Sequence, residues 1–317
     1  MKIMRKEIEI APMLDWTDTF FRQFMRQITV HAPLYTEMIA EQALVYGNRE
    51  KLLQYDTIEQ PLVLQVGGSD EMLMAKAAKI ANQHHFQAIN INAGCPSQRV
   101  QSGSFGACLM ATPEKVAACI HAMMSESDIP ITVKTRIALD TPDDITDGFD
   151  ACCRFVEATA NAGCHKLIIH ARKARLKNLT PKENRQKLPL NYDVVYRIKQ
   201  AFPELEILIN GNILSVQDIQ THLLHTDGVM IGRWAYANPY ALSQIDNLFY
   251  ADNHPILSRT QIIQNMLPLI LQQRKPLIVT RHMMGLYFGT EYAKKWKQAV
   301  MENTTTALEL FLKNAQF

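Results

Sequence analysis

The cysteine at position 95 lies in a turn whose composition suits chemistry. It stands between Gly94 and Pro96 in the stretch NINAGCPS (90–97), directly after an apolar, strand-like segment. A thiol held in such a turn can act as a nucleophile or as a proton donor. The other cysteines, at positions 108, 119, 152, 153 and 164, are interpreted as small buried hydrophobic residues. Cys95 is therefore the candidate catalytic residue.

Polar residues and glycine turns close several other apolar segments. Lys134 is embedded in the run ITVKTRI, and a buried ammonium is costly without a polar or anionic partner. Glycine in the turns at 210–212 and 232–233 permits close backbone approach to a phosphate, and Arg233 adds a charged donor. Gln65 can pair with an amide edge, so a phosphorylated planar cofactor such as FMN fits these residues. Two plain turns are the alternative interpretation.

Eight short apolar segments alternate with helical stretches and must position these residues. They are expected as strands at 7–13, 32–39, 61–68, 87–92, 131–137, 165–172, 206–213 and 228–233. Apolar strands alternating with helices indicate a parallel sheet covered by helices, and eight such units predict a (β/α)8 barrel. The polar residues then lie at the carboxyl ends of the strands, and loops after the last two strands are the usual phosphate site. A doubly wound open sheet is the alternative, although no GxGxxG follows the first strand.

The strand pattern stops near residue 245, which predicts two domains. Residues 1–245 are expected as the cofactor-binding catalytic barrel and residues 246–317 as an all-helical domain. From Pro255 to the end the chain holds 8 Lys or Arg and 3 Asp or Glu, whereas the whole chain has a net charge of only +2. A basic tail hints at a polyanionic partner, and a solvated helical surface is the alternative.

Composition limits the class of protein. The chain has 317 residues, of which 47% are hydrophobic and 20% charged, as in ordinary globular proteins. Its first residues lack the apolar stretch of a signal peptide, and no segment has the length of a membrane span. We therefore expect a cytoplasmic protein, a monomer, with reduced cysteines. No CxxC pair is present, so no metal site is expected.

Several motifs together resemble the tRNA-dihydrouridine synthase family. They are APMLDWTD (11–18), LQVGG (64–68), NINAGCPS (90–97), VKTRI (133–137), HARKARLKNLTPKENR (170–185), NGNI (210–213) and GVMIGR (228–233). Their order and spacing cover about residues 8–240, and the stretches 170–185 and 280–289 look most like the bacterial A-type branch. One departure is Asn212, where the family commonly has Gly or Asp, and backbone contacts to a phosphate should survive that change.

The resemblance implies an FMN-dependent oxidoreductase that reduces the C5–C6 bond of uridine in the tRNA D-loop, at U20 and U20a. NADPH is the implied reductant, with NAD(P)+ as acceptor in the reverse direction. Hydride would pass from flavin N5 to C6 of the uracil, and Cys95 would give the proton to C5. The residues implied for FMN are Pro12, Met13, Leu14, Gln65, Lys134, His170, Asn210, Gly211, Asn212, Gly232 and Arg233. Those implied for tRNA are Asn92, Lys182, Arg185 and Arg281.

Two other functions stay open from the residues alone. A flavin-dependent dehydrogenase of small pyrimidines would use the same turns and thiol, but it would not need the basic stretch 172–187 or the basic tail. A non-catalytic RNA-binding protein would use the charge and leave the Cys95 turn idle. Activity on tRNA compared with free pyrimidines, and a flavin absorption spectrum, distinguish the three functions.

Overall fold

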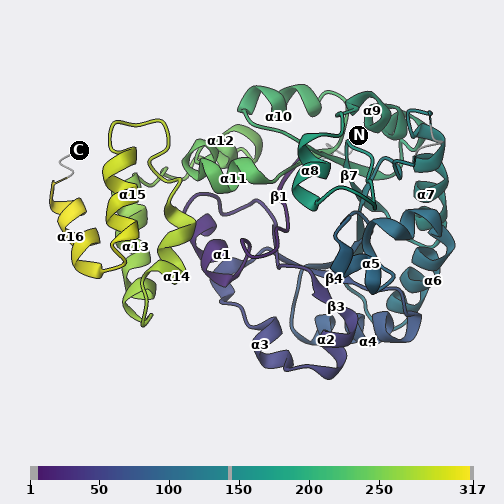
Figure 1. The fold of residues 1–317 in the computed structure, drawn as a ribbon, viewed down its shortest axis with the longest axis horizontal. Helices are drawn as coiled ribbons and strands as arrows, with labels where there is room; N and C mark the ends of the chain where they lie inside the picture. The colour runs from purple at the N-terminus through teal and green to yellow at the C-terminus, as the bar shows by residue number, and fades with distance from the viewer. Residues whose placement is uncertain (1–5, 142–144, 315–317) are drawn as a thin grey trace.

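The chain folds into a closed parallel barrel with a group of helices at one end (Figure 1). This computed structural model describes residues 6–141 and 145–314. The strands are β1 Glu7–Ile10, β2 Leu34–Tyr35, β3 Ile39–Ala40, β4 Leu62–Gly67, β5 Ala88–Asn92, β6 Ile131–Arg136, β7 Lys166–His170, β8 Glu206–Asn210 and β9 Gly228–Ile231. Hydrogen-bonded neighbours follow the order β1-β9-β8-β7-β6-β5-β4-β2, all parallel, and β3 also pairs with β4. A hydrogen bond from Ile10 N to Pro33 O, 3.0 Å long, joins the end of β1 to the residue before β2 and closes the barrel.

The expected (β/α)8 barrel is thus confirmed, and all eight expected strands are present within a few residues. One of them, 32–39, is divided into β2 and β3. The division occurs at Thr36, whose hydroxyl oxygen accepts from Gln65 N at 3.1 Å. A side-chain oxygen there replaces a backbone carbonyl in the ladder, so the regular pairing is interrupted. The two short strands together occupy one position of the barrel.

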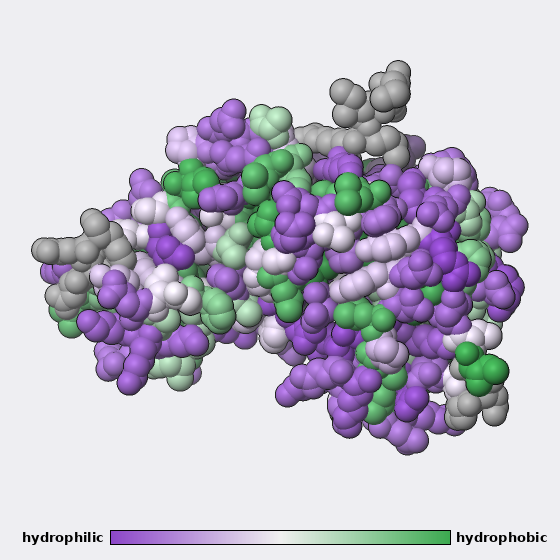
Figure 2. All heavy atoms as spheres, turned by 90° about the horizontal axis from the view of Figure 1, so that it is seen from above, coloured by the Kyte–Doolittle hydropathy of each residue, from purple (hydrophilic) through white to green (hydrophobic). Residues whose placement is uncertain are grey.

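Helices cover the outside of the barrel and form the C-terminal group. Around the barrel lie α1 Thr19–Arg26, α2 Glu41–Tyr46, α3 Arg49–Leu53, η1 Thr57–Glu59, α4 Glu71–Gln83, α5 Gln98–Ser102, η2 Gly106–Ala111, α6 Pro113–Met124, α7 Phe149–Asn161, α8 Pro181–Gln186, α9 Tyr192–Ala201, α10 Val216–His222, α11 Arg233–Ala237, η3 Pro239–Leu242 and α12 Ile245–Phe249. The C-terminal group consists of α13 Arg259–Leu271, α14 Leu277–Thr280, η4 Arg281–Met283, α15 Ala293–Met301 and α16 Thr305–Asn314. Hydrophilic residues predominate over both parts on the face shown in Figure 2.

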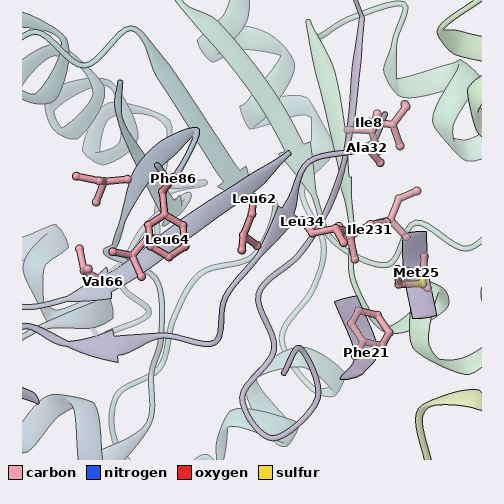
Figure 3. Packing of buried hydrophobic residues seen from close by; sticks show 14 of the residues in the cluster. Ile8, Phe21, Met25, Ala32, Leu34, Leu62, Leu64, Val66, Phe86 and Ile231 are labelled. Atoms are coloured by element: carbon pink, nitrogen blue, oxygen red, sulfur yellow. The ribbon is translucent and has the colours of Figure 1, made fainter. Parts of the chain in front are cut away.

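The strands are buried on both faces, which is why they read as apolar runs. Outward-facing residues pack against the helices, as Leu62, Leu64 and Val66 of β4 do in one cluster with Phe86 (Figure 3). Inward-facing residues form a second, smaller apolar layer inside the barrel. Its members are Ala11, Tyr35, Val63, Ala88, Ile168, Leu208 and Met230.

Below this apolar layer, at the amino ends of the strands, lies an ionic cluster that we call the base cluster: Glu7, Glu9, Lys166 and Glu206. The Lys166 ammonium lies 2.7 Å from Glu9 Oε1 and 3.2 Å from Glu206 Oε1, and it also pairs with Glu7. Tyr35 donates its hydroxyl to Glu9 Oε2 at 2.8 Å. Burial raises the pKa of Glu206 to about 7, against the lowering effect of Lys166.

The C-terminal helices have an aromatic core of their own. Trp296 and Tyr287 are buried, their ring centroids are 5.5 Å apart, and Phe311 lies 5.2 Å from Trp296. These rings therefore stabilise the helical group and are not exposed for stacking on bases. The division at residues 245 and 246 stays a prediction. Asp246 accepts hydrogen bonds from Thr29 and Val30 of the barrel, which attaches α12 to the barrel side.

Candidate active site

Strand alternation brings the polar residues of the motifs together inside the barrel. Successive side chains on a strand point to opposite faces, so residues two apart share a face. Apolar outward positions of β4 to β8 belong to the outer apolar cluster, and the positions between them point inward. At the carboxyl ends these inward positions hold Gln65, Asn92, Lys134, His170 and Asn210. The opening of the barrel at these carboxyl ends is called the mouth below.

The Cys95 turn lies on the rim of the mouth, after β5. Asn92 Oδ1 accepts from Gly94 N at 3.1 Å and from Cys95 N at 3.0 Å, so the side chain at the strand end shapes the turn. The Cys95 thiol is half-buried and lies 3.6 Å from the Ser97 hydroxyl oxygen. The thiol is thus held in place and remains reachable, as a proton donor must be.

A chain of side-chain amides supports that turn from below. Gln65 donates from Nε2 to Asn90 Oδ1 at 2.8 Å and accepts at Oε1 from Asn92 Nδ2 at 3.0 Å. Asn90 in turn donates to Thr132 Oγ1 at 2.9 Å. Gln65 and Asn92 were expected to contact FMN and tRNA, respectively. The structure places both at the mouth, and it gives each a positioning role that leaves only part of its hydrogen-bonding capacity for a ligand.

Lys134, His170 and Asn210 lie on three neighbouring strands of the mouth, β6, β7 and β8, with β7 in the middle. Lys134 donates to Asn210 Oδ1 at 3.1 Å, and Asn210 donates to Met230 O at 2.7 Å. Burial of the ammonium, followed by the nearby Arg136, lowers the pKa of Lys134 to about 7. Burial and the charges of Arg136 and Lys134 hold the pKa of His170 well below its ordinary value, so this imidazole is neutral.

Positive charge accumulates around the mouth without acidic partners. We call five residues the mouth cations: Lys134, Arg136, Arg172, Arg185 and Arg233. None of them forms an ion pair within the part of the chain that the structure describes. Burial lowers the pKa of Arg136 to about 10, and burial together with Arg233 lowers the pKa values of Arg172 and Arg185. Mutual repulsion among buried cations favours a bound anion.

The loops after β8 and β9 provide the glycine turns expected for a phosphate. Gly211 has φ +134° and Asn212 has φ +54°, backbone values that favour glycine and asparagine. A Cβ at Gly211 would lie 3.7 Å from His170 Nε2, so this turn borders the imidazole. A Cβ at Gly232 would meet nothing closer than Ala11 Cβ at 3.8 Å, so space exists beside its backbone. Arg233 follows directly as the first residue of α11.

The loop after β1 lies on the same rim. Met13 Sδ would be 4.0 Å from a Cβ at Gly232, which brings the β1 loop against the β9 turn. Met13 N donates to Thr17 Oγ1 at 3.0 Å, so the loop is fixed by its own residues. Pro12 and Met13 are half-buried, whereas the Leu14 side chain is 59% exposed. A contact between Leu14 and a cofactor stays a prediction.

The residues expected to contact tRNA are spread over a wider area. Arg185 and Lys182 lie on α8, Arg185 half-buried near the mouth and Lys182 exposed. Arg281 lies in the C-terminal group, where its Nη2 pairs with Asp18 Oδ2 at 2.6 Å. His282 also lies 3.1 Å from Asp18, at the junction of α1 with the C-terminal helices. Arg185 is therefore near enough to Cys95 for an electrostatic interaction, whereas Arg281 lies at the junction with the C-terminal helices.

Two residues of the mouth were mentioned in the sequence motifs without being assigned a role. Arg136 and Arg172 each lie two positions after a candidate residue, Lys134 and His170 respectively, and so share its inward face. Both residues are buried, at 4% and 6% exposure for Arg136 and Arg172, respectively. Buried His170 Nδ1 and Arg172 Nη1 have no hydrogen-bond partner among the described residues. Strand alternation was the signal that could have identified both arginines.

Neither metal binding nor membrane insertion is indicated within the ranges 6–141 and 145–314. No group of three or more His, Cys, Asp or Glu side chains there could hold a metal ion. No helix in those ranges is both long and apolar enough to cross a membrane.

Comparison with known proteins accounts for this combination of barrel, thiol turn and cations. The family model described as dihydrouridine synthase matches residues 9–316. A tRNA-dihydrouridine(20/20a) synthase of Synechocystis sp. is 46% identical over 304 residues, which cover 95% of this chain and 90% of that protein. Proteins with the same name from Shewanella oneidensis and Pasteurella multocida are 47% and 44% identical, over 95% and 96% of this chain and 90% and 92% of theirs. The chain belongs to the dihydrouridine synthase family.

Proposed function

We propose that this protein is a tRNA-dihydrouridine synthase that reduces the C5–C6 bond of uridines 20 and 20a in the tRNA D-loop. The observation that carries the proposal is the Cys95 turn on the rim of a mouth whose five cations form no ion pair with any residue that the structure describes. Membership of the dihydrouridine synthase family and the names of its relatives support the same activity. The cytoplasm, where tRNA is found, is the proposed location, and a monomer is the proposed state.

The residues of the mouth fit FMN. Buried polar atoms of His170 and Arg172 have no described partner, the mouth cations form no ion pair with a described residue, and space lies beside the Gly232 backbone. Lys134 and His170 would hold the ring with the remaining N–H of Gln65. The phosphate end would lie against Arg233 and the turns at 210–212 and 232. Bound there, the flavin would supply hydride chemistry, and NADPH is the proposed source of electrons.

Cys95 would hold the proton that the substrate needs. Its half-buried thiol stands on the loop after β5, beyond the strand that ends at Asn92, so it would meet the uracil on the side facing the tRNA. Protonation at C5 neutralises the negative charge that develops on the C5 and O4 side of the ring when C6 is reduced. Lys134 and Arg136 would lower the energy of that developing charge, because both are buried cations near the thiol.

The basic elements would hold the tRNA while one uridine leaves its stack. Unstacking costs a few kcal/mol, which contacts elsewhere on the tRNA must offset. Arg185 on α8 borders the mouth, Lys182 is exposed on the same helix, and Arg281 could exchange its partner Asp18 for a phosphate. Residues 246–317 are the proposed tRNA-binding domain. We call three exposed residues of this domain the α15 lysines: Lys294, Lys295 and Lys297.

The deciding experiment incubates the protein, FMN and NADPH with tRNA that lacks dihydrouridine and maps the reduced bases. We expect reduction at positions 20 and 20a and none of free uridine. Reduction of free pyrimidines in place of tRNA would favour a small-molecule dehydrogenase, and a protein without flavin would favour an RNA-binding role.

A cysteine variant tests the chemical step. Cys95→Ala should keep its flavin and its reduction by NADPH but slow single-turnover tRNA reduction about 10²- to 10⁴-fold. Cys153→Ala, which removes a half-buried thiol on α7, is the matched control and should react at the wild-type rate. A Cys95→Ala protein as fast as the control would remove this thiol from the mechanism.

A further inference from the structure

The backbone of the Cys95 turn is held at three consecutive carbonyl groups. Gly94 O accepts from Arg136 Nε at 2.8 Å, Cys95 O accepts from Ala107 N at 2.9 Å, and Pro96 O accepts from Gln101 Nε2 at 2.8 Å. The three donors come from β6, η2 and α5. The carbonyls on both sides of the thiol are therefore fixed by side chains from different elements.

The same two side chains also hold the loop that follows β7. Arg136 Nη1 donates to Lys173 O at 2.9 Å, and Gln101 Nε2 donates a second bond to Leu176 O at 2.9 Å. Residues 173 and 176 open the basic stretch that leads to Lys182 and Arg185 on α8. The Cys95 turn and the basic stretch are thus linked twice, through Arg136 on one side of the thiol and through Gln101 on the other.

We infer that Gln101 is a positioning residue for the Cys95 thiol, which it fixes against the basic stretch after β7. The inference rests on the proposed function of Cys95. Gln101 joins Pro96 O and Leu176 O with one amide group, because a primary amide offers two N–H donors. It belongs to neither the mouth cations nor the FMN residues, so its removal leaves the charge of the mouth unchanged.

The close packing around the turn leaves little room for another donor to replace the Gln101 amide. A Cβ at Gly106 would lie 2.6 Å from Cys95 O, so the neighbouring backbone already approaches the turn closely. Without the amide, Pro96 O and Leu176 O lose their shared donor, and the turn and the basic stretch can move apart. A shift of about 1 Å at a reacting group can cost about 10²-fold in rate.

The test compares two substitutions at Gln101 with the same substitutions at Gln98, an exposed glutamine on the same helix. Gln101→Ala removes the amide, and Gln101→Glu keeps the shape but replaces the donors with acceptors. Thermal unfolding and flavin absorbance first establish that each variant is folded and loaded. If the glutamate variant does not fold, Gln101→Ala alone is sufficient for the test.

The first readout is the alkylation rate of Cys95 by iodoacetamide without tRNA, followed by mass spectrometry of its peptide. We expect faster alkylation in Gln101→Ala than in Gln98→Ala, because the thiol is no longer held. The glutamate variant is compared only by turnover, because its added negative charge itself disfavours the reactive thiolate. The second is single-turnover tRNA reduction, which should slow about 10- to 100-fold. Its solvent deuterium isotope effect should increase, because a misplaced thiol makes proton transfer limiting.

The outcomes separate this inference from the proposed function. Alkylation and turnover rates equal to those of the Gln98 variants would overturn the positioning role. If Cys95→Ala reduced tRNA at the wild-type rate, the proposed role of the thiol would fail, whereas the alkylation rates would still decide whether Gln101 holds the turn.

Discussion

Raising the pH from 7 to 9 should weaken the binding of flavin to the apoprotein through Lys134. Without ligand, burial and Arg136 lower the pKa of this ammonium to about 7. A flavin whose ring or phosphate carries negative charge stabilises the charged amine and raises that pKa in the complex. The free protein then loses the Lys134 proton as the pH rises past about 7, while the complex keeps it. Affinity is therefore highest below pH 7 and falls above it.

The structure also gives the scale of the effect. The ordinary pKa of 10.5 lies about 3.5 units above the value in the free protein, so a ligand that cancels the whole lowering would raise the pKa by that amount. If binding restores two of these units, affinity at pH 9 is about 25-fold lower than at pH 7, because each unit corresponds to a factor of ten in the binding constant. His170 adds nothing in this range, because its pKa stays well below its ordinary value.

The assay titrates apoprotein with FMN and with riboflavin between pH 7 and 9 and follows flavin fluorescence. The second ionisation of a phosphate has a pKa of about 6, so the phosphate charge is nearly constant over this range. Lys134→Met should bind flavin more weakly, and its affinity should not change with pH. A wild-type affinity that is flat from pH 7 to 9, or an equal slope in Lys134→Met, would refute the reasoning.

Three further predictions follow from named contacts. Arg233→Ala should weaken FMN binding but leave riboflavin binding unchanged, and an equal loss for both ligands would place Arg233 away from the phosphate. Changing the α15 lysines to Glu should lower tRNA affinity and flatten its salt dependence, which is about −0.7 to −0.9 in the log–log slope for each phosphate contact; equal slopes would mean that tRNA docks elsewhere. Glu59→Gln should lower the free energy of unfolding in urea by about 3–5 kcal/mol, because it leaves the buried Arg22, 2.6 Å from Glu59, without a counter-ion. Glu126→Gln breaks an exposed pair and should cost less than about 1 kcal/mol, and equal losses would contradict this account.

The sequence predicted the barrel well, because its strands are apolar and each is buried on both faces. It missed the division of the second strand, because that depends on one hydroxyl, of Thr36, replacing a backbone acceptor for Gln65. Strand propensity carries no information about a side-chain oxygen that takes the place of a backbone carbonyl. The strand remains in its position because its neighbours still pair on both sides.

The candidate site was predictable where position on a strand decides it. Lys134 and His170 follow from alternation, and Arg136 and Arg172 could have been found in the same way. Gln101 could not, because its importance arises from two carbonyl groups, at Pro96 and Leu176, that lie far apart in the chain. Hydrogen bonds between distant loops depend on the tertiary fold, which no local pattern records.

The base cluster has a consequence for how a polyanion meets the protein. Three carboxylates surround Lys166 at the amino ends of the strands, and the five mouth cations lie at the carboxyl ends, with the inner apolar layer between them. Among these residues, acidic groups therefore gather at the amino end of the barrel axis and cations at the carboxyl end. An approaching RNA would be turned toward the positive end before any contact forms, and rotational search would be shortened. This orienting effect acts on the association rate. It weakens as the salt concentration rises, because the Debye length, about 8 Å at physiological salt, then becomes shorter.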